Sequence, residues 1–208
     1  MEKNMQTQFL ETVSLIGQES QIISEERKIT LDQLAQSIKD SMANFGFAKV
    51  ISVCTHNSRR SQLMQIVLQF LADQKGISGI ETFSGGTEGT AFNYRMVDAL
   101  RHFGFDLRVD KPGENPVYQL YETEDSARED YYFSKRFDNS YNPQEQFIAV
   151  MVCDEADVAC PFVPGAFNRI SLPYIDPKVS DDTPEEAQTY QDKVVEIARE
   201  MRYVVERL

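Results

Sequence analysis

A short apolar run, Val50 to Val53, breaks abruptly into polar residues before an apolar pattern resumes. The break reads Cys-Thr-His-Asn-Ser-Arg-Arg-Ser, from Cys54 to Ser61. The β-branched run predicts a buried strand, and the following "SQLMQIVLQFLADQ" has the spacing of a helix. A strand that passes through a tight polar loop directly into a helix is the opening unit of a parallel α/β fold.

The same alternation continues along the chain. The stretches "IETFS", "QFIAVMVC" and "NRISLP" predict further strands, while "AFNYRMVDALRHFG" and residues 183–208 predict helices. We therefore expect one α/β domain over residues 47–208, with three layers: a four-stranded parallel sheet and helices on both of its faces. Ligands of such sheets bind beyond the carboxyl ends of the strands, which is where Cys54 falls.

Residues 1–46 are expected to form a helical extension. "FLETVSLI" has helical spacing, and a second helix is expected from Thr30, in a capping box with Gln33, to a stop at Gly46. Its apolar face would pack either on the rest of the domain or on a second copy of the chain, in a homodimer held by these helices. That face consists of Leu31, Leu34, Ala35, Ile38 and Met42.

The polar segment between Phe105 and Phe147 is longer than an ordinary connection, and we expect it to hold a helix from Ser126 to Phe137. Its tyrosines would either pack as half-buried residues or shape a substrate entrance. They are Tyr118, Tyr121, Tyr131 and Tyr132.

Charge and cysteine usage narrow the class of function. A net charge of -12 argues against binding to nucleic acid or to an anionic membrane. No stretch approaches the roughly 18 apolar residues of a membrane span, and the N-terminus lacks a secretion signal, so we expect a cytoplasmic protein. Three cysteines indicate reduced thiols rather than a disulfide framework. The two histidines, His56 and His102, are too scattered for a zinc site, and no metal is expected.

The loop after the first strand has the chemistry of an anion site. Its backbone N–H groups would converge at the positive end of the following helix and bind a tetrahedral oxyanion. The same field would hold Cys54 as a thiolate nucleophile, with a hydrogen bond from Ser61, while Asn57 takes a left-handed backbone. The spacing alone also fits an inert buried thiol. The expected oxyanion-binding residues are Thr55, His56, Asn57, Ser58, Arg59 and Arg60, the last with a planar fork for two oxygens.

The stretch "VCTHNSRRS" resembles the phosphate loop of low-molecular-weight protein tyrosine phosphatases and of the thioredoxin-coupled arsenate reductases built on the same fold. "FSGGTEG" and "YIDPKVSD" extend the resemblance, which runs from about Lys49 to the C-terminus. It implies the low-molecular-weight phosphatase fold, and it makes Asp176 the general acid that protonates the leaving oxygen. The chain departs from the family pattern at three positions. His56 stands where glycine is usual, Arg59 stands where the reductases often have cysteine, and Gln65 stands where some reductases have an acidic residue near a potassium ion.

A second pair of cysteines separates the two activities. The reductases carry two cysteines six residues apart followed by proline, as in Cys153, Cys160 and Pro161. By this resemblance Cys54 attacks arsenate, Cys153 displaces arsenite, and Cys160 resolves the disulfide for thioredoxin or another thiol donor, without a cofactor. Alternatively, Cys153 ends a buried strand and Cys160 is incidental.

We therefore expect a cytoplasmic, thiol-dependent arsenate reductase. The alternative is a protein tyrosine or small-molecule phosphatase, which would hydrolyse phosphotyrosine or another phosphate ester through a phosphocysteine intermediate. A non-catalytic oxyanion sensor is the third interpretation.

Overall fold

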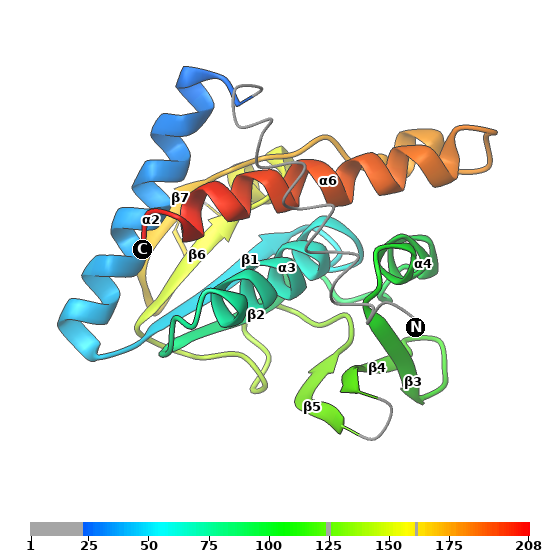
Figure 1. The fold of residues 1–208 in the computed structure, drawn as a ribbon, viewed down its shortest axis with the longest axis horizontal. Helices are drawn as coiled ribbons and strands as arrows, with labels where there is room; N and C mark the ends of the chain where they lie inside the picture. The colour runs from blue at the N-terminus through cyan, green and yellow to red at the C-terminus, as the bar shows by residue number, and fades with distance from the viewer. Residues whose placement is uncertain (1–22, 124–125, 161) are drawn as a thin grey trace, which may run out of the picture.

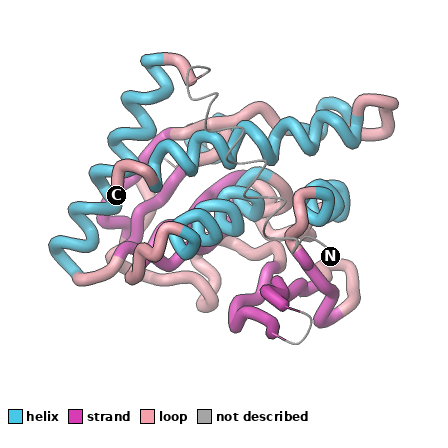
Figure 2. The backbone as a smooth tube through the Cα atoms, in the orientation of Figure 1, coloured by secondary structure: helices cyan, strands magenta, loops and turns pink. Residues whose placement is uncertain are grey.

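The computed structural model describes residues 23–123, 126–160 and 162–208 (Figures 1 and 2). The helices are α2 (Glu25–Phe45), α3 (Arg60–Gln74), α4 (Tyr94–His102), α5 (Asp154–Ala159) and α6 (Glu186–Val205), with a 3-10 helix η2 (Pro177–Ser180). The strands are β1 (Ala48–Cys54), β2 (Ile80–Gly86), β3 (Asp106–Lys111), β4 (Val117–Thr123), β5 (Ser126–Tyr132), β6 (Phe147–Met151) and β7 (Ala166–Ser171).

Four of these strands form the expected parallel sheet, in the order β2-β1-β6-β7. Because the strands are parallel, their carboxyl ends meet at one edge of the sheet. In the register, Val53 of β1 faces Gly85 of β2 and Met151 of β6. The loops that follow β1, β6 and β7 therefore start from the same edge, although they lie far apart in the sequence.

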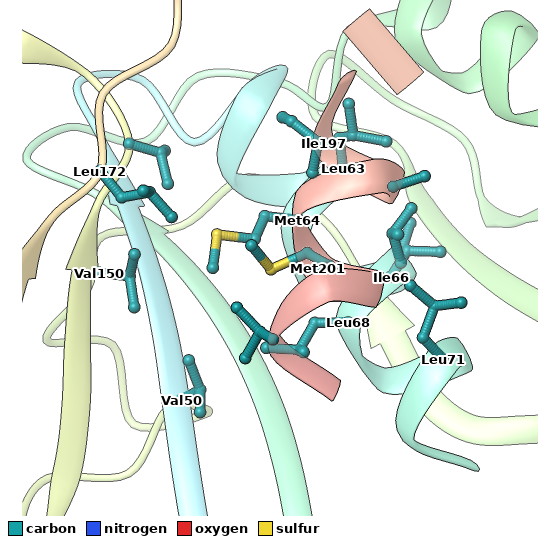
Figure 3. Close-up of a cluster of buried hydrophobic side chains, with 14 of the residues drawn as sticks. Val50, Leu63, Met64, Ile66, Leu68, Leu71, Val150, Leu172, Ile197 and Met201 are labelled. Carbon is teal, nitrogen blue, oxygen red and sulfur yellow. The ribbon is translucent and has the colours of Figure 1, made fainter. Parts of the chain in front are cut away.

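The core lies between the sheet and two long helices, α3 and α6, which pack against each other (Figure 1). In the cluster of Figure 3, Met64 of α3 lies beside Met201 of α6. Val50 and Val150 extend the same cluster from the sheet, and all four side chains are buried. This packing fixes the start of α3, and with it the loop that leads into that helix.

Helix α2 begins earlier than its sequence predicts. Ser24 accepts a hydrogen bond from the backbone N–H of Arg27, so the helix starts at Glu25 and not at Thr30. Gly46 ends it with a φ of 80°, as expected. The apolar face packs on α6, β1 and β7 of the same chain, which is one of the two predicted arrangements, and the homodimer stays a prediction. The "FLETVSLI" segment lies outside the described residues.

The helix predicted from Ser126 to Phe137 is wrong. Residues 126–132 form β5, the last strand of a three-stranded antiparallel sheet in the order β3-β4-β5. The local Ala-Arg-Glu sequence favours a helix, but Tyr132 pairs with Tyr118 across the strands and both rings are buried. Cross-strand burial of two aromatic side chains overrides a weak local preference.

None of the helices in the described residues is both long and apolar enough to cross a membrane.

Candidate active site

The loop between β1 and α3 wraps around the sulfur of Cys54. The backbone N–H of Asn57 donates a hydrogen bond to the Cys54 Sγ at 3.1 Å, and the Ser61 Oγ lies 3.1 Å from the same sulfur. Cys54 is 4% exposed, so these contacts act on a sulfur that is largely removed from water. The two contacts fix the sulfur between the loop and the first turn of α3.

Asn57 holds the loop in shape. It takes the left-handed backbone that its residue type predicts, with a φ of 47°. Its Oδ1 accepts hydrogen bonds from the backbone N–H of Lys135 at 2.9 Å and from the Gln62 Nε2 at 3.1 Å. Its Nδ2 donates to the Ser61 Oγ at 2.9 Å. One buried amide thus ties the loop to the first turn of α3 and to the segment after β5.

His56, which stands where the resembled family usually has glycine, needs no unusual backbone. Among the described residues, only Asn57, Gln146 and Asp182 have a positive φ without being glycine. The imidazole is largely exposed and lies 3.9 Å from a carboxylate oxygen of Glu88. The carbonyl oxygen of His56 accepts a hydrogen bond from the Ser134 Oγ at 2.8 Å. A histidine therefore fits this position with its side chain outside the loop.

A close approach of two backbones explains the glycine at the end of "FSGG". A Cβ atom on Gly86 would lie 2.6 Å from the carbonyl oxygen of Thr55 and 2.8 Å from the backbone nitrogen of Asn57. Real Cβ atoms do not come so near to backbone atoms. The end of β2 can therefore support the anion loop only through a residue without a side chain. Ser58 adds a second link on this side, since its Oγ donates to the carbonyl oxygen of Ala91 at 2.7 Å.

Arg60 and Asp176 lie together, although 116 positions separate them in the sequence. The Nη2 of Arg60 donates to the Asp176 Oδ2 at 2.6 Å, and its Nη1 donates to the carbonyl oxygen of Tyr174 at 2.7 Å. The other carboxylate oxygen of Asp176 accepts from the backbone N–H of Lys178 and caps η2. The segment after β7 thus carries a carboxyl group to the arginine of the anion loop.

The side chain of Arg59 points to a different group of residues. Its Nε donates to the Tyr190 Oη at 2.7 Å, and its Nη2 donates to the Asp181 Oδ2 at 3.1 Å. The Nε also lies 3.9 Å from the Asp176 Oδ1. Arg59 is one of the residues expected to bind an oxyanion. In the structure, its guanidinium is held by Asp181, which follows η2, and by Tyr190 of α6.

Cys153 follows β6 and lies beside the anion loop. Its Sγ is 3.5 Å from the Thr55 Oγ1, and its side chain is fully buried. Burial raises the pKa of the Cys153 thiol, hydrogen bonds from Thr55 and from the backbone N–H of Ala156 lower it, and the nearby Cys54 charge raises it. The thiol is therefore mainly protonated at neutral pH, and it contacts the loop that follows Cys54.

Cys160 lies at the opposite end of the six-residue helix α5 and is half-buried. Arg169 of β7 holds this end, because its Nη2 donates to the backbone oxygen of Asp157 at 2.7 Å and its Nε donates to that of Cys160 at 3.0 Å. The three cysteines are all free thiols. Pro161, the residue that completes the reductase-like pattern, lies outside the described residues.

Two residues that support the site were not identified from the sequence. Gln62 donates to both oxygens of Asn57 and to the carbonyl oxygen of Phe133, and Lys135 contributes its backbone N–H. A glutamine within an apolar helix pattern is a weak sequence signal for Gln62. Lys135 gives no sequence signal, because it acts through its backbone.

In the residues that the structure describes, no three histidine, cysteine or acidic side chains gather to hold a metal ion.

The fold and the loop together define a class: a parallel α/β domain whose first strand ends in a cysteine cradled by a C-x5-R loop. No protein-family model matches the chain, and no curated protein matches it in sequence.

Solved structures extend the comparison. The low molecular weight protein tyrosine phosphatase from T. tengcongensis is 13% identical with a TM-score of 0.52, over 77% of this chain and 99% of that one. The one from Bacillus subtilis is 13% identical with a TM-score of 0.51, over 77% and 96%. An arsenate reductase from Archaeoglobus fulgidus is 19% identical with a TM-score of 0.48, over 76% and 98%. The chain has the fold of the low molecular weight protein tyrosine phosphatases.

Proposed function

We propose that this protein is an enzyme in which Cys54 attacks a tetrahedral oxyanion, and that its reaction is the thiol-dependent reduction of arsenate. The observation that carries the proposal is the place of Cys153. Its Sγ lies 3.5 Å from the Oγ1 of Thr55, which belongs to the loop that surrounds Cys54. Hydrolysis of a phosphate ester needs no second thiol there, whereas reduction of arsenate needs two electrons from thiols.

The first step uses the loop and its two charged neighbours. An oxyanion that enters the loop competes with Asp176 for the guanidinium of Arg60, which now donates to that carboxylate at 2.6 Å. The Cys54 thiolate bonds to arsenic, and one arsenate oxygen leaves as water after it is protonated. Asp176 is the proposed proton donor, because it lies at the arginine that holds the oxyanion.

The second step moves two electrons from sulfur to arsenic. The Cys153 thiolate attacks the Cys54 sulfur, the sulfur–arsenic bond breaks, and its electron pair leaves with arsenic as arsenite. A Cys54–Cys153 disulfide remains. Cys160 then attacks Cys153, which frees the Cys54 thiolate and gives a Cys153–Cys160 disulfide.

The third step is the attack of Cys160 on Cys153. It requires α5 to unwind, because the six residues of this helix separate the two cysteines that must bond. A disulfide needs Cα atoms within about 7 Å, and seven residues of helix span about 10 Å. The helix is short, and Val158 within it is 81% exposed, so the main contacts that this change must break are the hydrogen bonds from Arg169 to Asp157 and Cys160. The proposed reductant is a thioredoxin-like dithiol protein, and the reduced thiols fit a cytoplasmic location.

The alternative function is hydrolysis of phosphate esters. The two structures with a TM-score above 0.5 reported above are named protein tyrosine phosphatases, and Cys54, Arg60 and Asp176 suffice for that reaction. Water would then attack a phosphocysteine on Cys54, and Cys153 would be a buried structural thiol.

Counting free thiols after a single turnover separates these functions. One equivalent of arsenate, without reductant, should lower the count from three to one per chain and release arsenite. Cys54→Ser should keep its remaining thiols and release none. A wild-type protein that hydrolyses an aryl phosphate, yet keeps all three thiols with arsenate, is a phosphatase. Failure of both reactions removes every enzymatic interpretation.

A further inference from the structure

We propose that Arg59, the last of the five variable residues of the C-x5-R pattern, is a positioning residue that fastens the acid-bearing segment 176–181 to the anion loop. This inference rests on the proposed function for the role of Asp176, and on the contacts of Arg59 for everything else. Arg59 precedes α3 directly, so its backbone belongs to the loop that surrounds Cys54. Its side chain leaves the loop and reaches the segment that carries Asp176.

The contacts form a closed triangle. The Arg59 Nε donates to the Tyr190 Oη at 2.7 Å, the Tyr190 Oη donates to the Asp181 Oδ1 at 2.7 Å, and the Arg59 Nη2 donates to the Asp181 Oδ2 at 3.1 Å. Tyr190 is 1% exposed. Burial, followed by the hydrogen bond to Asp181, raises the pKa of Tyr190, so its hydroxyl stays protonated and keeps donating.

The triangle holds one end of a short segment whose other end carries Asp176. Asp176 caps the start of η2, and Asp181 follows its end, so the 3-10 helix joins the carboxyl group at the site to the carboxyl group held by Arg59. The side chains of Arg59 and Asp181 are only 13% and 17% exposed. Hydrogen bonds between charged groups that are shielded from water are stronger than those between neutral groups. This short link connects the carboxyl group at Arg60 to the contacts that Arg59 makes with Asp181.

Arg60 alone would hold Asp176 poorly during turnover. An oxyanion in the loop takes the fork of Arg60, and the ion pair with Asp176 at 2.6 Å is then weakened when the acid is needed. Arg59 donates to Tyr190 and Asp181 instead, so these contacts do not use the fork of Arg60 that the oxyanion takes. The two adjacent arginines therefore divide the work: Arg60 binds the anion, and Arg59 keeps the acid in place.

The test compares Arg59→Met with Asp176→Asn and with the control Arg207→Met, which removes an ion pair to Asp32 at the far end of α6. In Arg59→Met, turnover of phenyl phosphate should fall about tenfold or more, and that of p-nitrophenyl phosphate, which needs little protonation, by less than about threefold. Inhibition by inorganic phosphate should change by less than about twofold, because Arg60 is intact. Arg59→Met should add no further loss in the Asp176→Asn background.

Hydrogen exchange gives a readout that needs no activity. The amides of residues 176–182 should exchange faster in Arg59→Met, and as in the wild type in Arg207→Met. Unchanged exchange in Arg59→Met overturns the inference, and so does equal slowing of both esters. If the wild-type protein hydrolyses neither ester, the phosphatase alternative fails, and the exchange data alone decide whether Arg59 holds the segment.

Discussion

Replacing Asn57 by alanine removes the hub of the anion loop, and its cost can be estimated from the contacts. The change deletes the acceptor of the Lys135 backbone N–H, one of the three acceptors of the Gln62 amide, and the donor to Ser61. The site is fully buried, with Asn57 0% exposed, so these groups gain no bulk water in exchange. A buried polar group that loses its partner costs about 1–3 kcal/mol.

The backbone adds a second term. At a φ of 47°, alanine loses the local stabilisation that lets asparagine adopt the left-handed region, which costs about 1 kcal/mol. One buried donor, the Lys135 N–H, is left without an acceptor, because the Gln62 amide keeps the backbone oxygens of Asn57 and Phe133. The free energy of unfolding should therefore fall by about 2–4 kcal/mol, a large part of the about 5–15 kcal/mol that domains of this kind have in total.

Urea unfolding, followed by circular dichroism, measures this loss, and Asn57→Gly is the matched control. Glycine loses the same hydrogen bonds but adopts the left-handed backbone freely, so it should be more stable than the alanine variant by about 1 kcal/mol. A loss below about 1 kcal/mol in Asn57→Ala would refute the role of Asn57 as the hub. If the two variants were equally stable, the backbone contribution would be absent.

Three further predictions follow from the acid, the second thiol and a buried cation. Asp176→Asn should slow hydrolysis of aryl phosphates with poor leaving groups by about 10²- to 10⁴-fold and those with good ones less; equal slowing would make Asp176 structural. Because burial raises the pKa of Cys153, disulfide formation after arsenate should speed up by nearly tenfold per pH unit from about pH 6.5 to 8, and a flat profile contradicts thiolate attack. Burial also lowers the pKa of Lys135 from 10.5 to about 8, so between these values the unfolded chain binds more protons than the native one. The free energy of unfolding should then rise with pH by up to about 1.4 kcal/mol per unit, and Lys135→Met should lose that rise; a variant that keeps it would refute the assignment.

The parallel sheet could be predicted because its two central strands are apolar runs of the length that buried strands need. Val50 to Val53 and the run that ends at Met151 show this directly, and both are buried in the sheet. The position of the loop between β1 and α3 could be predicted for the same reason, since it is the polar break between a buried strand and a buried helix. The small antiparallel sheet could not, because its stability comes from pairs such as Tyr118 and Tyr132 that are distant in the sequence.

The site required information that no local pattern carries. Asp176 could be placed only by resemblance, because an Asp-Pro pair alone predicts a turn. The contact between Arg59 and Tyr190 joins residues 131 positions apart, and it depends on how α6 lies on the domain. Spacing gave the positions of Cys153 and Cys160, but not that the first would lie against Thr55. Long-range packing decides such contacts, and a single sequence does not encode them in any short window.

The relay is tested most directly by trapping its intermediate. Cys160→Ser protein, treated with one equivalent of arsenate and analysed by mass spectrometry under conditions that preserve disulfides, should contain a Cys54–Cys153 bond. It should release about one arsenite per chain and then stop, because the resolving thiol is absent. A Cys160→Ser protein that keeps both Cys54 and Cys153 as free thiols, with arsenate unchanged, would contradict the proposed reduction.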